Sequence, residues 1–143
     1  MFKTTQIHHD KLRAYEATEY RLGHTDQDIV LTINKRSERL ATLFAANGVS
    51  CGAFITAFNP RGAIQSDAAN ARGHAELASK LQELGVNALE GFGSEEGSEW
   101  PAEKSYFALG LALEPAKAIG THFDQDAIVW VGQDAVPKLI LLR

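Results

Sequence analysis

The order and polarity of the predicted elements indicate an α+β fold built on one antiparallel sheet. Residues 52–131 follow the order β-α-β-β-α-β. In the arrangement typical of this order the strands lie side by side as 4-1-3-2, which places 52–58 and 105–113 at the centre. These two strands are also the least polar of the four. The sequence therefore predicts a ferredoxin-like split βαβ core over residues 52–131.

Length and composition indicate one folded domain. The chain has 143 residues, of which 45% are hydrophobic and 22% are charged, as in ordinary globular proteins. We find no internal repeat, no linker rich in proline or serine, and no change of composition that would divide the chain. A single domain over residues 1–143 is expected.

Three elements are expected before the core. Residues 10–17 predict a short helix with Asp10 as its N-cap, and residues 19–34 predict a β-hairpin. A further helix is expected to begin after an N-cap at Ser37 and to end at Gly48, which suits the left-handed C-terminal position.

Within the core, strand 52–58 ends at the turn cluster NPRG (59–62), and Ser66 is expected to cap a long helix that reaches Leu84. The other expected elements are strands 86–92, 105–113, 127–131 and 138–142, a loop over 93–99 and a helix over 114–123. One stripe of the long helix carries the residues expected to be buried: Asn70, His74, Leu77, Leu81 and Leu84.

In this topology one end of the sheet collects several strand ends and the start of the long helix, and polar residues are concentrated there. The positions expected to converge are Thr56, Asn59, Arg61, Ser66, Asn70, Gly91, Gly93, Trp100, Glu103, Ser105 and Gln125. From this set the candidate ligand-binding residues are Thr56, Asn59, Arg61, Ser66, Asn70, Trp100, Ser105 and Gln125, and Glu103 is the one candidate acid or base.

Two interpretations of this end remain open. In the first it binds a small polar or anionic ligand, with or without catalysis: Asn59 and Asn70 orient the ligand, Arg61 and the helix N-terminus take a negative group, and Trp100 covers it. In the second, the chain is a non-catalytic protein-interaction or regulatory module and the same residues lock a long loop. We expect Asn70 to be structural, because its stripe faces the sheet, and Asn59 to serve a ligand.

Several short motifs lie in order along the chain: FITAFNP, Ser66 with Asn70, Gly91-Phe92-Gly93, Trp100-Pro101 followed by Glu103 and Ser105, and Gln125 before AIVW. In this order they resemble a bacterial family, domain of unknown function 3293, over roughly residues 11–142. The resemblance implies a free-standing bacterial domain and no particular activity. The family pattern prefers Asn where this chain has Asp126.

Several chemistries lack their sequence signals. The five histidines form no pair at i, i+4 spacing, and Cys51 is a lone cysteine expected to be a small core residue, so no metal site is expected. Gly91 and Gly93 lack the third glycine of a dinucleotide fingerprint, and no G-x-S-x-G nucleophile motif occurs. No cofactor is expected.

The charge distribution opposes binding to nucleic acid. Residues 40–143 carry seven basic and twelve acidic side chains, and the stretch from Glu83 to Glu103 holds six acids and no base. No window approaches 18 apolar residues, and the start of the chain has no signal-peptide pattern. A cytoplasmic protein outside the membrane is expected, and its oligomeric state is left open.

Overall fold

The structure is a computed structural model, and it describes residues 5, 7–23, 29–94 and 102–143. It is an α+β protein, as predicted. Its elements are α1 (His9–Ala17), β1 (Glu19–Leu22), β2 (Ile29–Leu31), α2 (Glu38–Asn47), β3 (Gly52–Ile55), a 3-10 turn (Pro60–Gly62), α3 (Asp67–Glu83), β4 (Asn87–Ser94), β5 (Glu103–Leu109), α4 (Leu113–His122), β6 (Ala127–Val131) and β7 (Pro137–Leu141).

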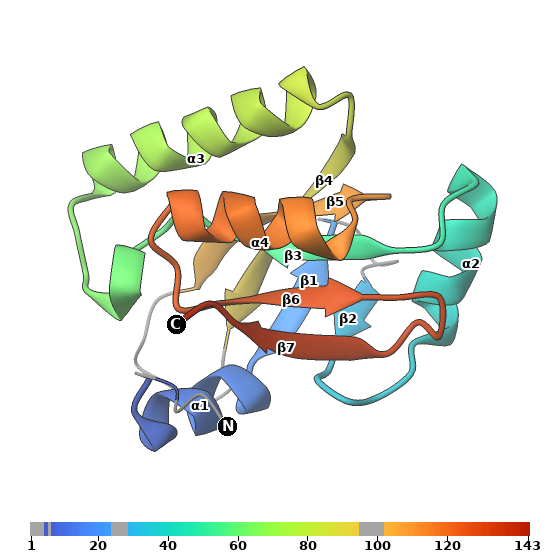
Figure 1. Cartoon of the computed structure of the whole chain (residues 1–143), viewed down its shortest axis with the longest axis horizontal. Coiled ribbons are helices and arrows are strands. Elements are labelled where there is room, and N and C mark those ends of the chain that lie inside the picture. Colours follow the sequence, from blue (N-terminus) through green and yellow to red (C-terminus); the bar gives the residue numbers. More distant parts are fainter. Residues whose placement is uncertain (1–4, 6, 24–28, 95–101) are drawn as a thin grey trace.

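The strands form one antiparallel sheet in the order β2-β1-β4-β5-β3-β6-β7 (Figure 1). Strands β3 and β5 are adjacent and antiparallel, with Phe54 opposite Phe107. This confirms the prediction that the two least polar strands lie side by side at the centre. The predicted N-terminal hairpin, β1 and β2, extends one side of the sheet, and β7 extends the other.

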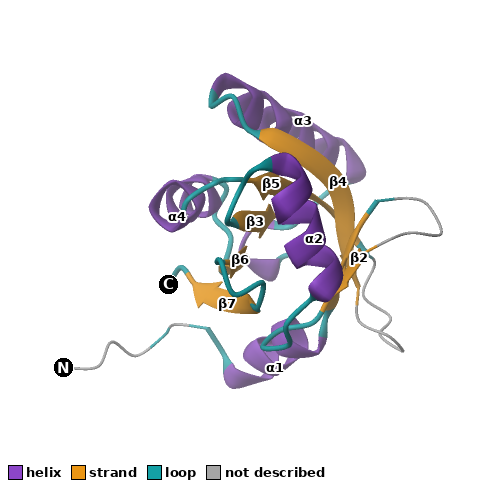
Figure 2. Cartoon of the chain, turned by 90° about the vertical axis from the view of Figure 1, so that its right-hand side faces the viewer, coloured by secondary structure: helices purple, strands orange, loops and turns teal. Residues whose placement is uncertain are grey.

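The sheet curls until its two edges approach each other (Figure 2). Beyond β2, the Asn34 amide donates to the Pro137 carbonyl at 2.8 Å and the Ser37 amide donates to the Ala135 carbonyl at 2.9 Å. The close pairing of β1 with β4 requires glycine at Gly91, where a Cβ atom would collide with a backbone carbonyl of β1. The curl gives the sheet a convex and a concave face.

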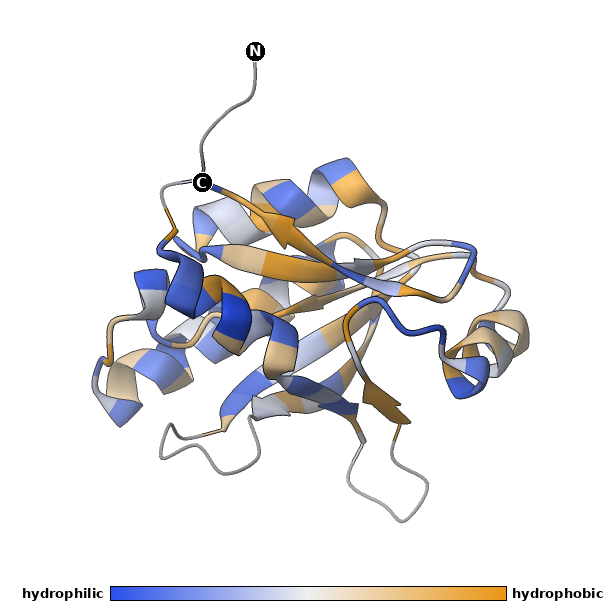
Figure 3. Ribbon diagram, turned by 90° about the horizontal axis from the view of Figure 1, so that it is seen from below, coloured by the Kyte–Doolittle hydropathy of each residue, from blue (hydrophilic) through white to orange (hydrophobic). Residues whose placement is uncertain are grey.

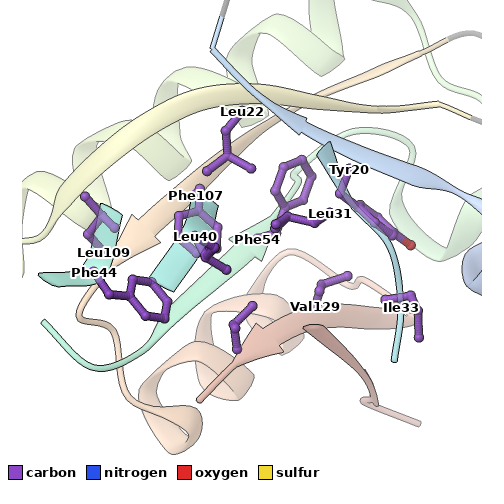
Figure 4. Packing of buried hydrophobic residues seen from close by; sticks show 11 residues of the cluster. Tyr20, Leu22, Leu31, Ile33, Leu40, Phe44, Phe54, Phe107, Leu109 and Val129 are labelled. Carbon is purple, nitrogen blue, oxygen red and sulfur yellow. The ribbon is translucent and has the colours of Figure 1, made fainter. Parts of the chain in front are cut away.

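Each face has its own apolar cluster. Helices α3 and α4 cover the convex face, where Leu77 and Ile119 pack with Ile55 and Ile128. On the concave face, helix α2 contributes Leu40 and Phe44, as Figure 4 shows. Sequence reasoning did not say which element covers this second face, and the structure assigns it to α2. The concave cluster comprises Tyr20, Leu22, Leu31, Ile33, Leu40, Phe44, Phe54, Phe107, Leu109, Val129 and Val131.

The predicted caps of α2 and α3 are confirmed. The Ser37 hydroxyl accepts from the Leu40 amide at 3.1 Å, and the Ser66 hydroxyl accepts from the Ala69 amide at 3.1 Å. Gly48 ends α2 with φ +64°, a left-handed conformation that suits glycine.

Helix α1 begins earlier than predicted. Its N-cap is His8, whose Nδ1 accepts from the Asp10 amide at 3.2 Å, so the prediction of Asp10 as the cap is wrong. Asp10 lies instead in the first turn, where a carboxylate complements the positive end of the helix dipole.

The two central strands end before the apolar runs that predicted them. Strand β3 ends at Ile55 rather than residue 58, and β5 ends at Leu109 rather than residue 113. Gly110 follows β5 with φ +82°, and Leu111 stays buried beyond it. An apolar run indicates burial and does not fix where a strand ends, since Leu111 is buried outside the sheet between the exposed residues Gly110 and Ala112.

The end of α3 and the next loop also differ from prediction. Helix α3 ends at Glu83, and Leu84, which was expected on its buried stripe, is the C-cap and is 55% exposed. Strand β4 runs through Ser94, so the loop predicted over 93–99 is wrong at its first two positions, and residues 95–99 lie outside the described residues. Within the described part of the chain, no helix combines the length and apolar character that a bilayer span requires.

Replacing Leu40 with alanine tests whether α2 completes the concave core. Leu40 is fully buried, so Leu40→Ala is expected to lower the free energy of unfolding by about 2–5 kcal/mol through lost burial and the cavity left behind. Leu84→Ala, the same change at an exposed position, is expected to alter it by no more than about 0.5 kcal/mol. Chemical denaturation measures both, and equal losses would contradict the assignment.

Candidate functional site

The concave face is filled at the α2 end and hollow at the α1 end. A cavity of about 340 Å³ lies there, bounded by α1 and by strands of the curled sheet. Its apolar wall includes Phe54, Val129 and Leu139. Its lining residues are Lys11, Ala14, Tyr15, Thr18, Tyr20, Phe54, Thr56, Asn59, Gly62, Gly93, Ser94, Glu103, Ser105, Gln125, Ala127, Ile128, Val129 and Leu139.

The structure brings part of the predicted set to this cavity. Thr56, Asn59, Glu103, Ser105 and Gln125 all line it, as expected from the convergence of strand ends. They come from the end of β3 and the turn after it, from the start of β5 and from the residue pair before β6. The topology of the sheet therefore places side chains 69 positions apart in sequence, from Thr56 to Gln125, around one space.

Gly93 of the converging set lines it as well, whereas Arg61, Ser66 and Asn70 are not among the described residues that line it. The Arg61 side chain is largely exposed and lies 4.0 Å from Asp124, and Ser66 caps α3. Asn70 is buried behind Asn59, and Trp100 lies outside the described residues. The guanidinium and the helix N-terminus expected to take an anion are thus not among the residues that line the cavity.

Asn59 and Asn70 form a network of buried amides at the edge of the cavity. The Asn70 Oδ1 accepts from the Asn59 amide at 2.9 Å and from Gln65 Nε2 at 2.7 Å, and Asn70 Nδ2 donates to Asn59 Oδ1 at 3.1 Å. Asn59 has φ +45°, a left-handed conformation that Asn tolerates better than most residues. On the cavity side, Asn59 Nδ2 donates to Glu103 Oε2 at 2.8 Å and so orients this carboxylate.

The other predicted polar side chains of the cavity donate hydrogen bonds to backbone carbonyls of the protein. The Thr56 hydroxyl donates to the Lys104 carbonyl at 2.7 Å, and the Ser105 hydroxyl donates to the Glu103 carbonyl at 3.2 Å. Gln125 Nε2 donates to the Phe58 carbonyl at 3.0 Å. These side chains therefore hold the strand ends in place while they line the cavity.

Asp126, a residue that sequence reasoning left outside the site, holds α1 against the end of the sheet. Its side chain is completely buried, and its Oδ2 accepts from Lys11 Nζ at 2.9 Å and from the Tyr15 hydroxyl at 2.8 Å. Its Oδ1 accepts from Arg143 Nε. Burial alone would raise the pKa of Asp126, but these three hydrogen bonds outweigh burial and lower the pKa below its usual value.

Polar contacts dominate the attachment of α1 to the sheet. No residue of α1 is fully buried, and Figure 3, which views the molecule from below, shows a largely hydrophilic helix. Lys11 Nζ also donates to the Arg61 carbonyl at 2.8 Å, and the Tyr20 hydroxyl donates to the Tyr15 carbonyl at 2.8 Å. Burial raises the pKa of Tyr15 and Tyr20, so both phenols remain neutral.

The residues missed from the sequence were thus Lys11, Tyr15, Tyr20 and Asp126. Lys11 and Tyr15 are four residues apart, a spacing that places them on one face of a helix. That spacing was visible, but where α1 docks was not. At Asp126 the signal was a departure from the Asn that the resemblance described above implied.

The histidines serve other roles in the described structure. His74 lies on α3 and stacks on Tyr106, with ring centroids 4.4 Å apart, and burial lowers the pKa of its imidazole. His122 Nε2 lies 3.2 Å from Glu76 Oε1. Among the described residues, one group offers three metal-ligand atoms within 4.8 Å of one another; it is exposed and consists of His8, His9 and Asp10.

Cys51 has no sign of an activated thiol. It is half-buried, its Sγ lies 3.5 Å from the Leu111 carbonyl oxygen, and burial raises the pKa of the thiol. A raised pKa leaves little thiolate near neutral pH, and the thiolate is the nucleophilic form.

Comparison with protein families finds a match to a protein of unknown function (DUF3293) over residues 55–128. The match spans just over half of the chain. The chain belongs to the DUF3293 family. The match is narrower than the resemblance over 11–142 and covers Asn59, Glu103 and Asp126, but not Lys11 or Tyr15. A search of curated proteins finds no match, and neither does a search of solved structures.

Asp126→Asn tests the buried carboxylate through pH. The unfolded chain releases this proton near pH 4, about the ordinary value for Asp, and the folded chain releases it at lower pH. Ionisation of Asp126 therefore adds stability above about pH 4, and this contribution is lost as pH falls below it. We expect Asp126→Asn to lower the free energy of unfolding by about 1–3 kcal/mol at pH 7, with a smaller difference near pH 3.

Denaturant unfolding between pH 3 and pH 7 measures this difference. The matched control is Asp134→Asn, because Asp134 is half-exposed and pairs with Lys138 at 3.7 Å on the surface. A deficit for Asp126→Asn that stays constant from pH 7 to pH 3 would contradict the role assigned to the charge.

Asn70→Ala tests the amide network. The change removes the acceptor for the buried Asn59 amide and the donor to its side chain, so a loss of about 1–3 kcal/mol for each buried group left unsatisfied is expected. Asn87→Ala, at an exposed position of β4, is the control and is expected to be nearly neutral. Thermal and denaturant unfolding provide the measurement, and an Asn70→Ala variant as stable as the control would show that the network contributes little.

Proposed function

We propose that this chain binds a small molecule in the cavity between α1 and the concave face of the sheet. The observation that carries the proposal is the cavity itself, about 340 Å³ in volume, which both apolar and polar side chains line. Ligand pockets in proteins typically have volumes of about 300–1,000 Å³ and combine apolar surface with a few placed polar groups. Strongly curled sheets also hold single small ligands in their interiors.

A polar ligand fits this wall better than an anionic one. Glu103 contributes a carboxylate to the lining, whereas Arg61 and the N-terminus of α3 lie outside it. An anion in the cavity would face the Glu103 carboxylate, which costs free energy when water is excluded. Glu103 remains the candidate acid or base, and its participation in a reaction stays a prediction.

The alternative, a protein-interaction module, has less support. Interaction surfaces usually present a continuous apolar patch. Among the described residues the exposed large apolar side chains are Ile64, Leu84 and Leu141, which belong to three separate segments of the chain. The empty space inside the curl favours a small ligand over a docked protein surface.

We further propose that residues 52–131 form a ferredoxin-like core. The adjacency β4-β5-β3-β6 supports this assignment, since it is the order 4-1-3-2 read from the other side. The packing of α3 and α4 against one face supports it as well. Strands β1, β2 and β7 then extend the core into the curled sheet that encloses the cavity.

Filling the cavity tests the binding proposal. Ala127 lines the cavity, and leucine at this position adds three carbon atoms to it. We expect Ala127→Leu to fold and to lose binding of small aromatic probes such as benzyl alcohol and benzylamine. In the unmodified protein these probes are expected to shift the NMR signals of Tyr15, Tyr20 and Phe54.

The matched control is Ala71→Leu, the same change on the exposed side of α3. Binding should survive in this variant. Probe-induced shifts that map to another face, or that persist in Ala127→Leu, would refute the proposal. A complete lack of binding by the whole probe set would favour the interaction module instead.

A further inference from the structure

We infer that the ligand is a small aromatic molecule of the phenol or indole class, which donates an O–H or N–H hydrogen bond to the Tyr15 hydroxyl oxygen. This inference rests on the proposed function, because it names the class of molecule that the same cavity selects. Three properties of the wall support it: the hydrogens that its polar groups have already donated, the bond between Tyr15 and Asp126, and its aromatic rings.

Most hydroxyl groups of the wall donate their hydrogen to the protein. Among the described lining residues six carry a hydroxyl, and five of these donate to other protein groups. A hydroxyl has one hydrogen and two lone pairs, so each of the five can only accept from a ligand. Gln125 Nε2 likewise donates to the carbonyls of Phe58 and Phe123, which leaves its Oε1 as an acceptor. The five hydroxyls belong to Tyr15, Thr18, Tyr20, Thr56 and Ser105.

The other donors of the described wall are few. Lys11 Nζ donates twice to the protein and Asn59 Nδ2 donates once, and Ser94 carries the sixth hydroxyl. A ligand that only accepts hydrogen bonds would leave most of the surrounding oxygens unpaired, and a buried polar group without a partner costs free energy. The wall therefore favours a ligand that donates. Because the hydroxyl and amide oxygens are uncharged, the ligand needs a donor and no charge.

Tyr15 is the strongest of these acceptors. Its hydroxyl donates to Asp126 Oδ2 at 2.8 Å, and the Asp126 side chain is completely buried behind the lining residues. A hydroxyl that donates to a carboxylate is polarised, and this strengthens any bond that its own oxygen accepts. Burial raises the pKa of Tyr15, so the phenol keeps the hydrogen on which this arrangement depends. The expected chain of hydrogen bonds runs from the ligand to Tyr15 and from Tyr15 to Asp126.

The size and the rings of the cavity favour an aromatic body. An apolar cavity of about 150 Å³ can hold benzene, so the cavity of about 340 Å³ has room for one or two rings. Tyr20 and Phe54 line it, and their rings meet edge to face with centroids 5.2 Å apart. Aromatic rings prefer such edge-to-face or offset contacts, which a further ring can extend. Phenols and indoles combine an aromatic body with a single donor.

Pairs of probes with nearly equal shape test the donor. Phenol is compared with fluorobenzene, and indole with benzofuran, by NMR titration of the full chain. The second molecule of each pair lacks the donor and is more apolar, so a cavity that selected for apolar character alone would bind it more tightly. We expect phenol and indole each to bind about two- to tenfold more tightly than their counterparts, which is the effect of one net hydrogen bond.

Tyr15→Phe tests the acceptor, because phenylalanine keeps the ring and removes the oxygen. In this variant we expect the two members of each pair to bind within about twofold of each other. Tyr106→Phe is the matched control, since Tyr106 packs with the convex cluster, stacks on His74 and is not among the residues that line the cavity. It is expected to keep the preference of the unmodified protein. The NMR spectrum of each variant establishes that it is folded before the titration.

A second measurement uses the unmodified protein. The NMR signal of the tyrosine Cζ carbon responds to hydrogen bonding at the attached hydroxyl. In protein labelled with carbon-13 at this atom, phenol and indole are expected to shift the Tyr15 signal more than fluorobenzene and benzofuran do. The Tyr106 signal is expected to stay in place with all four probes.

The outcomes separate this inference from the proposed function. If fluorobenzene and benzofuran bind in the cavity as tightly as phenol and indole, or if the preference persists in folded Tyr15→Phe, the inference is wrong and the binding cavity stands. If Tyr15→Phe does not fold, equal shifts of the Tyr15 signal with both members of each pair overturn the inference in the same way. If none of the four probes binds there, and Ala127→Leu behaves like the unmodified protein, both are wrong.

Discussion

The buried carboxylate of Asp126 is the interaction on which the arrangement of the cavity depends. It lies directly before β6 and receives hydrogen bonds from Lys11 and Tyr15 on α1 and from Arg143 after β7. Burying an ionised carboxylate costs free energy unless its oxygen atoms accept hydrogen bonds. These partners must therefore stay in place as long as Asp126 is ionised. An apolar stripe attaches α2 to the sheet, but α1 has no fully buried residue. The charge of Asp126 therefore provides the attachment of α1.

The curl of the sheet and this carboxylate together leave a space that the core does not fill. At one end, Leu40 and Phe44 of α2 enter the concave face. At the other end, Lys11 and Tyr15 of α1 extend toward Asp126, so they line the cavity and do not fill it. The amides of Asn59 and Asn70 bond to each other and orient Glu103 in the lining. The groups that keep the cavity open therefore donate most of their hydrogens to other protein groups, and the polar part of the wall presents mainly hydrogen-bond acceptors.

Local features of the chain were well predicted where local physics decides them. Ser37 and Ser66 cap helices because a hydroxyl three residues before a free amide is a short-range interaction. The central pairing of β3 with β5 followed from hydrophobicity, since the least polar strands lie where both faces are covered. The cap of α1 and the ends of β3 and β5 were mispredicted, because His8 competes as a cap and buried chain extends beyond the ladder.

By itself the sequence determined the class of the fold, the central strands and the convergence of Thr56, Asn59, Glu103, Ser105 and Gln125 at one end of the sheet. These depend on periodicity, capping and strand order, which are encoded in neighbouring residues. Only the tertiary structure decided that α1 docks there, that Arg61 and Ser66 point elsewhere and that a cavity results. The bonds from Lys11 and Tyr15 to Asp126 span 115 and 111 positions, and contacts of that range form only after the sheet has curled and brought its ends together.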